Sequence, residues 1–97
     1  MKTKESSKLK RRRITFRYEN PGAQQVHLVG DFNGWDETKH PMTNKVKGHW
    51  EKNVLLLPGT YEYKFIVDGH WKKDPANEEC RTNSFGTSNS VLRVPAT

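Results

Sequence analysis

The sequence contains one cysteine, Cys80, and no long apolar segment. A single cysteine excludes a disulfide within the chain and favours a reducing, cytoplasmic setting. No apolar run approaches the roughly 18–20 residues that a membrane-spanning helix needs. The N-terminus is basic, but no apolar stretch follows it as in a secretory signal. We therefore expect neither a membrane partner nor secretion.

Hydrophobic residues are also scarce, at 32% of the 97 residues, and this length allows one domain with a modest core. The net charge is +6, and it is unevenly distributed. Residues 1–13 hold seven basic residues and one glutamate, a difference of +6, so residues 14–97 are formally neutral. We expect residues 1–13 to be a disordered basic tail, with binding of an anionic partner as the alternative. Residues 14–97 then form the folded module.

The residue types needed for catalysis or metal binding lack the necessary arrangement. Asp31, Asp36, Asp68 and Asp74 occur in turn sequences, where aspartate is favoured because it satisfies the backbone. No pair of carboxylates for glycoside hydrolysis is indicated. The four histidines and the single cysteine do not have the spacing of metal ligands. We therefore expect no enzymatic activity, no metal and no cofactor.

The chain from residue 14 onward has the alternating pattern of β-strands separated by turn sequences. Short strands at this spacing predict an all-β fold, an antiparallel β-sandwich, with a small barrel as the alternative. Two polar segments, 31–48 and 74–88, are long for hairpin connections, and such loops often carry function. The predicted strands cover residues 14–18, 25–30, 49–57, 60–67, 70–73 and 90–94.

The hairpin turn before Trp71 determines which way this side chain points. A two-residue loop, Asp68-Gly69, pairs Ile66 with Trp71, and cross-strand partners share one face of a sheet. Trp71 is then expected on the outer face, with Lys64 as its diagonal neighbour. A shift of one residue in register would reverse this orientation. The opposite face carries the expected core residues Tyr61, Tyr63, Phe65 and Val67.

The three tryptophans have different expected roles. Trp71, beside Lys64, either covers the sheet edge or offers a flat face to a sugar ring or a nucleotide base. Trp35 follows an Asn-Gly turn and either caps the end of the sandwich or forms a second such platform. Trp50 shares one strand face with two aliphatic residues, so we predict it in the core.

Several short motifs occur in one order: VHLVGDFNGWD, PM, GHWEKNVLLLPGTYEYKFIVDGHWKKDPAN and FGTSNSVLRV. In this order they resemble the family 48 carbohydrate-binding modules, the glycogen-binding domain type of AMP-activated protein kinase β subunits, isoamylases and branching enzymes. The resemblance covers about residues 16–94. It implies an immunoglobulin-like, early-set β-sandwich that binds α-1,4-linked glucan such as glycogen, starch or maltodextrin without catalysis.

The resemblance also implies which residues contact the sugar. Phe85 stands where kinase-type members usually carry leucine, and this apolar side chain would reach through the ring of the bound glucan. The implied site comprises two aromatic platforms, the apolar finger and three polar contacts: Trp35 and Trp71, Phe85, and Lys64, Thr87 and Asn89.

Two other functions stay open. A protein-interaction module of the same fold would recruit an enzyme or kinase partner through an exposed sheet face or edge. A nucleic-acid binder would use the basic tail together with the outward tryptophans, although the neutral charge of residues 14–97 disfavours it.

Overall fold

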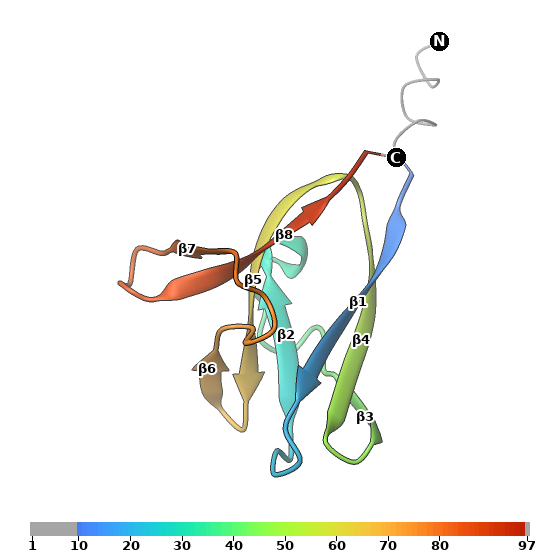
Figure 1. Ribbon diagram of the computed structural model, residues 1–97, viewed down its shortest axis with the longest axis vertical. Helices are drawn as coiled ribbons and strands as arrows, with labels where there is room; N and C mark the ends of the chain where they lie inside the picture. Colours follow the sequence, from blue (N-terminus) through green and yellow to red (C-terminus); the bar gives the residue numbers. More distant parts are fainter. Residues whose placement is uncertain (1–9, 97) are drawn as a thin grey trace.

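Eight short strands and a 3₁₀ helix of three residues, η1, make up the part of the chain that the computed structural model describes, residues 10–96 (Figure 1). Of the predicted tail, residues 1–9 lie outside the described residues, and the first strand begins at Arg12. The elements are β1 (Arg12–Glu19), β2 (Val26–Gly30), η1 (Asp31–Asn33), β3 (Thr43–Val46), β4 (His49–Leu56), β5 (Gly59–Val67), β6 (His70–Lys72), β7 (Cys80–Thr82) and β8 (Ser88–Val94).

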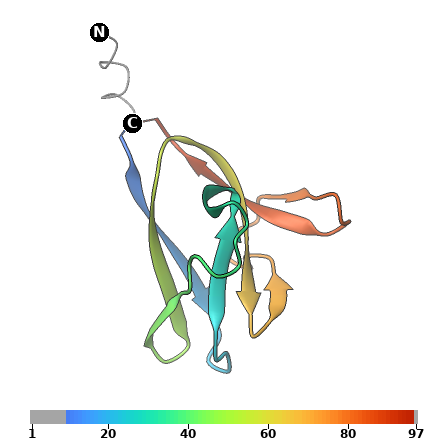
Figure 2. The same ribbon diagram turned by 180° about the vertical axis from the view of Figure 1, so that it is seen from behind.

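The strands form two antiparallel sheets that lie against each other (Figures 1 and 2). The smaller sheet has the order β1-β4-β3. The larger sheet has the order β2-β5-β8-β7, and β6 pairs with β5. Two separate sheets confirm the predicted β-sandwich and exclude the barrel. The two ends of the described chain lie side by side, where Arg12 Nη1 donates to the Pro95 carbonyl at 3.4 Å (Figures 1 and 2).

The core lies between the sheets and uses alternate residues of the long strands. Phe16 contacts Tyr63 with ring centroids 5.1 Å apart, and Tyr18 contacts Phe65 at 5.0 Å, so aromatic pairs join the two sheets. Trp50 is only 6% exposed and belongs to this cluster, which confirms its predicted place. The other buried members are Val26, Leu28, Met42, Val54, Leu56, Val67 and Val94.

Two strands lie where the sequence predicts loops. β3 falls within the predicted loop 31–48, and β7 falls within the predicted loop 74–88. All residues of both strands are exposed. Their sequences therefore have no alternation between buried and exposed positions, which is the signal that the prediction used. Backbone pairing with β4 and β8 forms these strands without burying their side chains.

The turn between β5 and β6 has the predicted two-residue loop. Asp68 and Gly69 have φ angles of 49° and 85°, the left-handed values of a type I′ hairpin turn. Ile66 pairs with Trp71 as expected, and Trp71 is 45% exposed. The outward orientation of Trp71 is therefore confirmed. The Asp68 carboxylate accepts backbone N–H bonds from residues 24 and 25, and so ties this turn to the start of β2.

Hydrogen bonds attach the connection from β6 to β7 to strands β5 and β8 of the larger sheet. Asp74 is buried and accepts a hydrogen bond from the Tyr63 hydroxyl at 2.6 Å, while Asp74 N–H donates to Ser90 Oγ at 2.9 Å. Asn77 Nδ2 donates to the Tyr63 hydroxyl and to the Val91 carbonyl. Burial, and then the bond to Asp74, raises the pKa of Tyr63, so the phenol stays protonated. Asp74 therefore joins the core to this loop in addition to its expected role in the turn.

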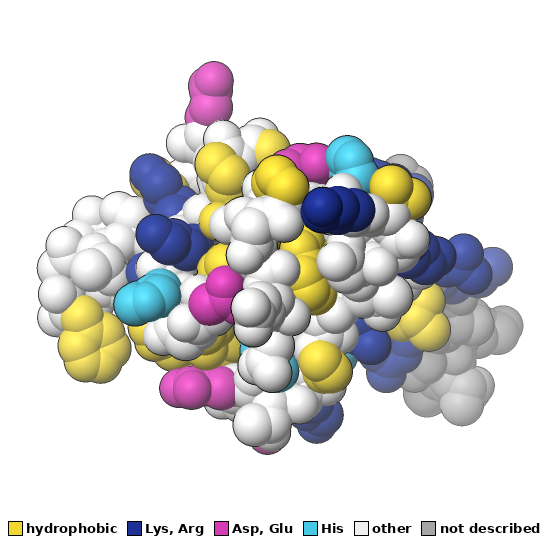
Figure 3. All heavy atoms as spheres, turned by 90° about the horizontal axis from the view of Figure 1, so that it is seen from below, with side chains coloured by type: hydrophobic (Ala, Val, Ile, Leu, Met, Phe, Trp, Pro, Cys, Tyr) yellow, Lys and Arg dark blue, Asp and Glu magenta, His cyan; other side chains and the backbone are white. Residues whose placement is uncertain are grey.

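The end of the molecule that carries the β1–β2, β3–β4 and β5–β6 turns presents a mixed surface. Basic, acidic and hydrophobic side chains are interspersed on it (Figure 3). Within residues 10–96, no helix is long and apolar enough to span a membrane.

Candidate functional site

A cleft of about 670 Å³ lies between the loop after η1, strands β5 and β6, and the tip of the β7–β8 hairpin. All six residues that the sequence singled out line it: Trp35, Lys64, Trp71, Phe85, Thr87 and Asn89. The structure thus brings together residues from three separate segments of the chain. Their role as sugar contacts stays a prediction. The other lining residues are Asp31, Glu62, Asn83 and Ser84.

The two tryptophans lie next to each other in this cleft. The ring centroids of Trp35 and Trp71 lie 6.5 Å apart, and the ring planes meet at 41°. Trp71 comes from the outer face of the larger sheet, whereas Trp35 comes from the loop that follows η1. Two tilted planar faces suit a curved ligand that has C–H groups along one side.

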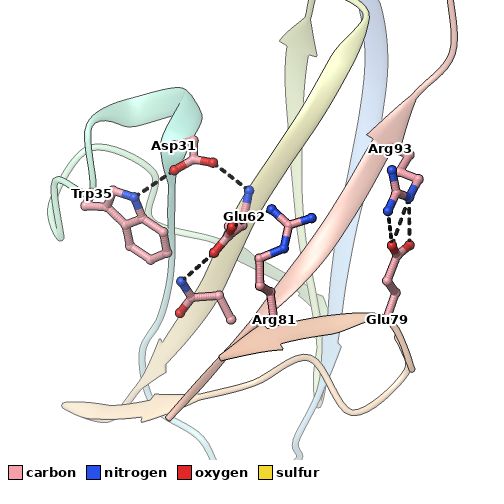
Figure 4. Close-up of polar contacts among 7 residues, drawn as sticks. Asp31, Trp35, Glu62, Glu79, Arg81 and Arg93 are labelled. Carbon is pink, nitrogen blue, oxygen red and sulfur yellow. Dashed lines mark hydrogen bonds and ion pairs between the residues drawn. The ribbon is translucent and has the colours of Figure 1, made fainter. Parts of the chain in front are cut away.

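A hydrogen-bond network fixes the position of Trp35. Its backbone has a φ of 60°, a left-handed conformation that is uncommon for a residue with a large side chain. The Trp35 N–H donates to the Gly30 carbonyl at 3.0 Å, and its indole Nε1–H donates to Asp31 Oδ1 at 3.0 Å. The other oxygen of Asp31 accepts the backbone N–H of Glu62 at 2.7 Å (Figure 4). The carboxylate therefore links the Trp35 ring to strand β5.

The close approach of η1 to β5 requires glycine at position 30. A Cβ on Gly30 would lie 2.6 Å from the Glu62 carbonyl oxygen and 2.8 Å from Tyr63 Cβ. These are contacts that real Cβ atoms do not make, and both involve atoms that cannot move aside easily. Glycine at the end of β2 therefore allows Asp31, the next residue, to reach the backbone of β5.

Lys64 lies within the site rather than at its rim. It shares the outer face of β5 with Ile66, as predicted, but the side chain is only 8% exposed. The Lys64 Nζ donates to Thr87 Oγ1 at 3.3 Å, because the β7–β8 hairpin reaches back over this face. Asn83 Nδ2 donates to the same Oγ1 at 2.8 Å. Since both lone pairs of the Thr87 hydroxyl are engaged, its O–H remains to donate to a ligand.

Asn89 and Glu62 form the polar wall of the cleft. Asn89 Nδ2 donates to Glu62 Oε1 at 3.0 Å, and Arg81 Nη1 donates to Glu62 Oε2 at 3.1 Å. Arg81 neutralises the charge of Glu62, so the wall offers hydrogen-bonding groups without a net charge. Further along the hairpin, Arg93 Nε donates to both oxygens of the Glu79 carboxylate at 2.8 and 3.1 Å (Figure 4).

Phe85 projects from the tip of the β7–β8 hairpin and is 89% exposed. The next residue, Gly86, has a φ of 83°, which allows the chain to turn back toward β8. An aromatic side chain this exposed has little cover from the protein itself. It is therefore available to a ligand that occupies the cleft.

Sequence reasoning missed Asp31, Glu62, Asn83 and Ser84 as lining residues. Glu62 could have been found, because the parity argument places it on the face of Trp71. Ser84 begins the loop segment SFGTSN and Asn83 precedes it directly, but no residue pattern marks their contacts. Asp31 stands within the GDFNGW segment, where the sequence predicts only a role in the turn. In residues 10–96, no group of three or more histidine, cysteine, aspartate or glutamate side chains could hold a metal ion.

His40 supports the loop that carries Trp35. Asn33 Oδ1 accepts the Gly30 N–H at 3.1 Å, which fixes the orientation of the Asn33 amide. Its Nδ2 then donates to the Leu28 carbonyl at 3.0 Å and to His40 Nδ1 at 2.8 Å. His40 Nδ1 must therefore be an unprotonated acceptor. Protonation would place two donors against each other and break this bond.

We expect the stability of the protein to decrease as the pH falls through the ordinary histidine range. Burial, and then the charges of Lys52 and Lys39, lowers the pKa of His40 from 6.5. Below pH 6.5 the unfolded chain binds a proton that the folded protein does not, so the free energy of unfolding falls with pH. Urea unfolding between about pH 8 and pH 5 measures this. His40→Gln should reduce the dependence, and His70→Gln, at the exposed start of β6, should leave it intact; equal curves for all three proteins would contradict the assignment.

Comparisons with known proteins show the family to which the chain belongs. A family described as the glycogen recognition site of AMP-activated protein kinase matches residues 12–97. The chain belongs to this family. Members of similar sequence include the 5'-AMP-activated protein kinase subunit beta-1 of Rattus norvegicus, which is 35% identical over 98 residues and covers all of this chain. The resemblance inferred from the short motifs is thereby confirmed.

Two plant proteins are also similar to this chain, and their names describe them as chloroplastic. Protein PTST homolog 2 of Arabidopsis thaliana is 47% identical over 72 residues, or 74% of this chain. Protein FLOURY ENDOSPERM 6 of Oryza sativa subsp. japonica is 40% identical over 77 residues, or 79% of this chain. The chain spans 13% and 14% of the length of these two proteins and 34% of the rat kinase subunit.

Proposed function

We propose that the protein binds α-1,4-linked glucan, such as glycogen, starch or maltodextrin, without catalysing a reaction on it. The observation that carries the proposal is the convergence of all six matched residues on one cleft, in a chain that belongs to a glycogen-recognition family. The tilted faces of Trp35 and Trp71 follow the curvature of a helical glucan and contact the C–H faces of its rings. Phe85 enters the apolar interior of the curved chain.

Polar groups within the cleft fix the sugar hydroxyls. The Thr87 O–H donates, and Lys64 Nζ has two further hydrogens beyond the one that Thr87 accepts. Asn89 has one free N–H and one free lone pair, because one of each is used within the protein. These groups are held in place before the ligand arrives, which reduces the entropy lost on binding.

The proposal that the protein is not an enzyme agrees with the state of the two carboxylates in the cleft. Both oxygens of Asp31 accept hydrogen bonds from the protein, and so do both oxygens of Glu62. Each carboxylate thus holds neighbouring groups in place, whereas glycoside hydrolysis needs a pair of carboxyl groups that act on the sugar.

Calorimetric titration with maltoheptaose and cellohexaose tests the proposal. The two sugars carry the same kinds of hydroxyl and differ in linkage, in curvature and by one glucose unit in length. We expect saturable binding of maltoheptaose with a Kd in the micromolar to millimolar range, as is usual for a small open site. Binding should barely respond to salt, since the ligand is neutral. Equal binding of cellohexaose would contradict the curvature argument, and no binding of either sugar would contradict the function.

Binding experiments with nucleic acid and with a protein partner separate the other functions. A nucleic-acid partner would bind with strong salt dependence that is lost on deleting residues 1–13. A protein partner is a second component of the proposal, because a relative is named as a kinase subunit. Binding of such a partner that persists with maltodextrin present would place its surface away from the cleft. The cytoplasmic setting expected from the single cysteine is part of this proposal.

A further inference from the structure

Phe85, the apolar finger of the proposed site, lies on a loop whose shape depends on the hydrogen bonds of one side chain. Phe85 lies at the tip of the turn between β7 and β8, and its exposure shows that packing does not determine its direction. The path of the backbone therefore decides where the ring points. Within this loop, the contacts that set the path converge on Asn83.

Asn83 uses every hydrogen-bonding position of its side-chain amide. Its Oδ1 accepts the backbone N–H of Phe85 at 3.0 Å and of Thr87 at 3.1 Å. Its Nδ2 donates to Thr87 Oγ1 at 2.8 Å and to Asn89 Oδ1 at 3.0 Å. The backbone of Asn83 adds a bond to the Thr87 carbonyl at 2.8 Å and one from the Gly86 N–H at 3.1 Å. One residue thus contacts the three hairpin residues of the proposed site.

The geometry of this amide determines the orientation of the neighbouring polar groups. Because two N–H donors meet Oδ1, the amide of Asn83 cannot be reversed without losing both bonds. Its Nδ2 therefore faces Asn89 Oδ1, which directs Asn89 Nδ2 toward Glu62 Oε1. Its second N–H occupies a lone pair of Thr87 Oγ1, which leaves the Thr87 proton for the ligand.

We propose that Asn83 is the positioning residue of the glucan site: it holds Phe85, Thr87 and Asn89 in their binding geometry before the sugar arrives. This inference rests on the proposed function. It adds to the site a residue that acts on the sugar through Phe85, Thr87 and Asn89. Without the hydrogen bonds of Asn83, the backbone of the loop and three side chains would become ordered only when the sugar binds. The entropy lost in this ordering weakens binding. Asn83→Ala should therefore weaken maltoheptaose binding roughly tenfold.

Two variants separate positioning from direct contact. Asn83→Ala removes all four side-chain bonds, whereas Asn83→Asp keeps an acceptor for the N–H groups of Phe85 and Thr87 and loses both donors. In the sugar-free protein, hydrogen exchange of the Phe85 and Thr87 amides should accelerate in Asn83→Ala and stay near wild type in Asn83→Asp. Both variants should bind more weakly, with Asn83→Asp intermediate. Should Asn83→Ala fail to fold, weaker binding by Asn83→Asp than by the wild type supports the proposal, and wild-type affinity of Asn83→Asp overturns it.

Asn77→Ala is the matched control. Asn77 also forms three side-chain hydrogen bonds in a connection between strands, but it does not line the cleft. This variant should lose stability and keep the affinity of the wild type. If Asn77→Ala and Asn83→Ala weaken binding equally, the effect is general loosening and the assignment of Asn83 is wrong.

A double-mutant cycle that combines Asn83→Ala with Phe85→Ala tests whether Asn83 acts through Phe85. A merely structural role of Asn83 would give additive losses of affinity. If Asn83 acts through Phe85, removing the ring costs less affinity in the Asn83→Ala protein than in the wild type. Additive losses, or weaker binding of the Asn83→Ala protein with unchanged exchange of its Phe85 amide, would overturn the proposal. If the wild type binds no glucan, the proposed function fails, while hydrogen exchange of the free protein still shows whether Asn83 orders the loop.

Discussion

Trp71→Ala is expected to abolish measurable glucan binding and to leave the fold intact. The indole is 45% exposed on the outer face of the larger sheet, so its removal creates no cavity in the core. Truncating a central aromatic contact typically weakens binding by about 2 kcal/mol or more, roughly 30-fold. A site with a Kd in the micromolar to millimolar range then binds the sugar too weakly for a titration to measure. Calorimetry with maltoheptaose measures the loss, and thermal unfolding checks the fold.

Replacing Trp35 tests the same platform with a substitution that suits the local backbone. Its left-handed φ of 60° is unfavourable for most residues and suits glycine. Trp35→Gly should therefore remove the platform and relieve the backbone conformation, so that binding is lost while stability changes little. Retained binding in both the Trp71→Ala and Trp35→Gly proteins would refute the assignment of the two indoles as the sugar platform.

Trp50→Ala should have the opposite phenotype, a large loss of stability. Trp50 is 6% exposed, lies on the central strand of the smaller sheet and donates its indole N–H to the Asn20 carbonyl at 3.3 Å. Replacing a buried tryptophan by alanine costs about 3–5 kcal/mol, because a cavity remains in the core. For a domain of this size, that is a large fraction of the total free energy of unfolding.

Chemical denaturation of the Trp50→Ala and Trp71→Ala proteins gives a matched comparison of the same substitution at a buried and an exposed site. Trp50→Phe serves as a second control, since it fills part of the cavity and should lose less stability than Trp50→Ala. An unchanged denaturation midpoint for Trp50→Ala would contradict the place of Trp50 in the core.

The orientation of the outer-face residues could be predicted because it follows from local rules. A two-residue turn fixes the register of β5 and β6, and the period of two along a strand then assigns Trp71, Lys64 and Glu62 to one face. The same alternation identified most of the core. These predictions needed no knowledge of how distant segments meet.

The features that the sequence did not reveal depend on contacts between distant segments. β3 and β7 are strands only because β4 and β8 pair with them, and their own residues carry no alternation. Lys64 is buried because the hairpin that carries Thr87 reaches across it. Arg81 meets Glu62 because β7 lies beside β8 and β8 lies beside β5, an order of strands that the local pattern does not contain.

The site residues of the β7–β8 hairpin came from the family resemblance rather than from their own chemistry. A polar loop with one phenylalanine has no pattern that predicts a ligand. The structure adds the reason that this loop has a defined shape, which is the closed set of bonds around Asn83.

The most direct test of the central claim is a titration of ¹⁵N-labelled protein with maltoheptaose, followed by two-dimensional NMR. The account predicts shifts of the indole N–H signals of Trp35 and Trp71, of the Asn89 amide and of the backbone of residues 83–89, with the indole of Trp50 unchanged. No shift at millimolar sugar, or shifts spread over the β1-β4-β3 sheet instead of the cleft, would contradict the claim that this cleft binds glucan.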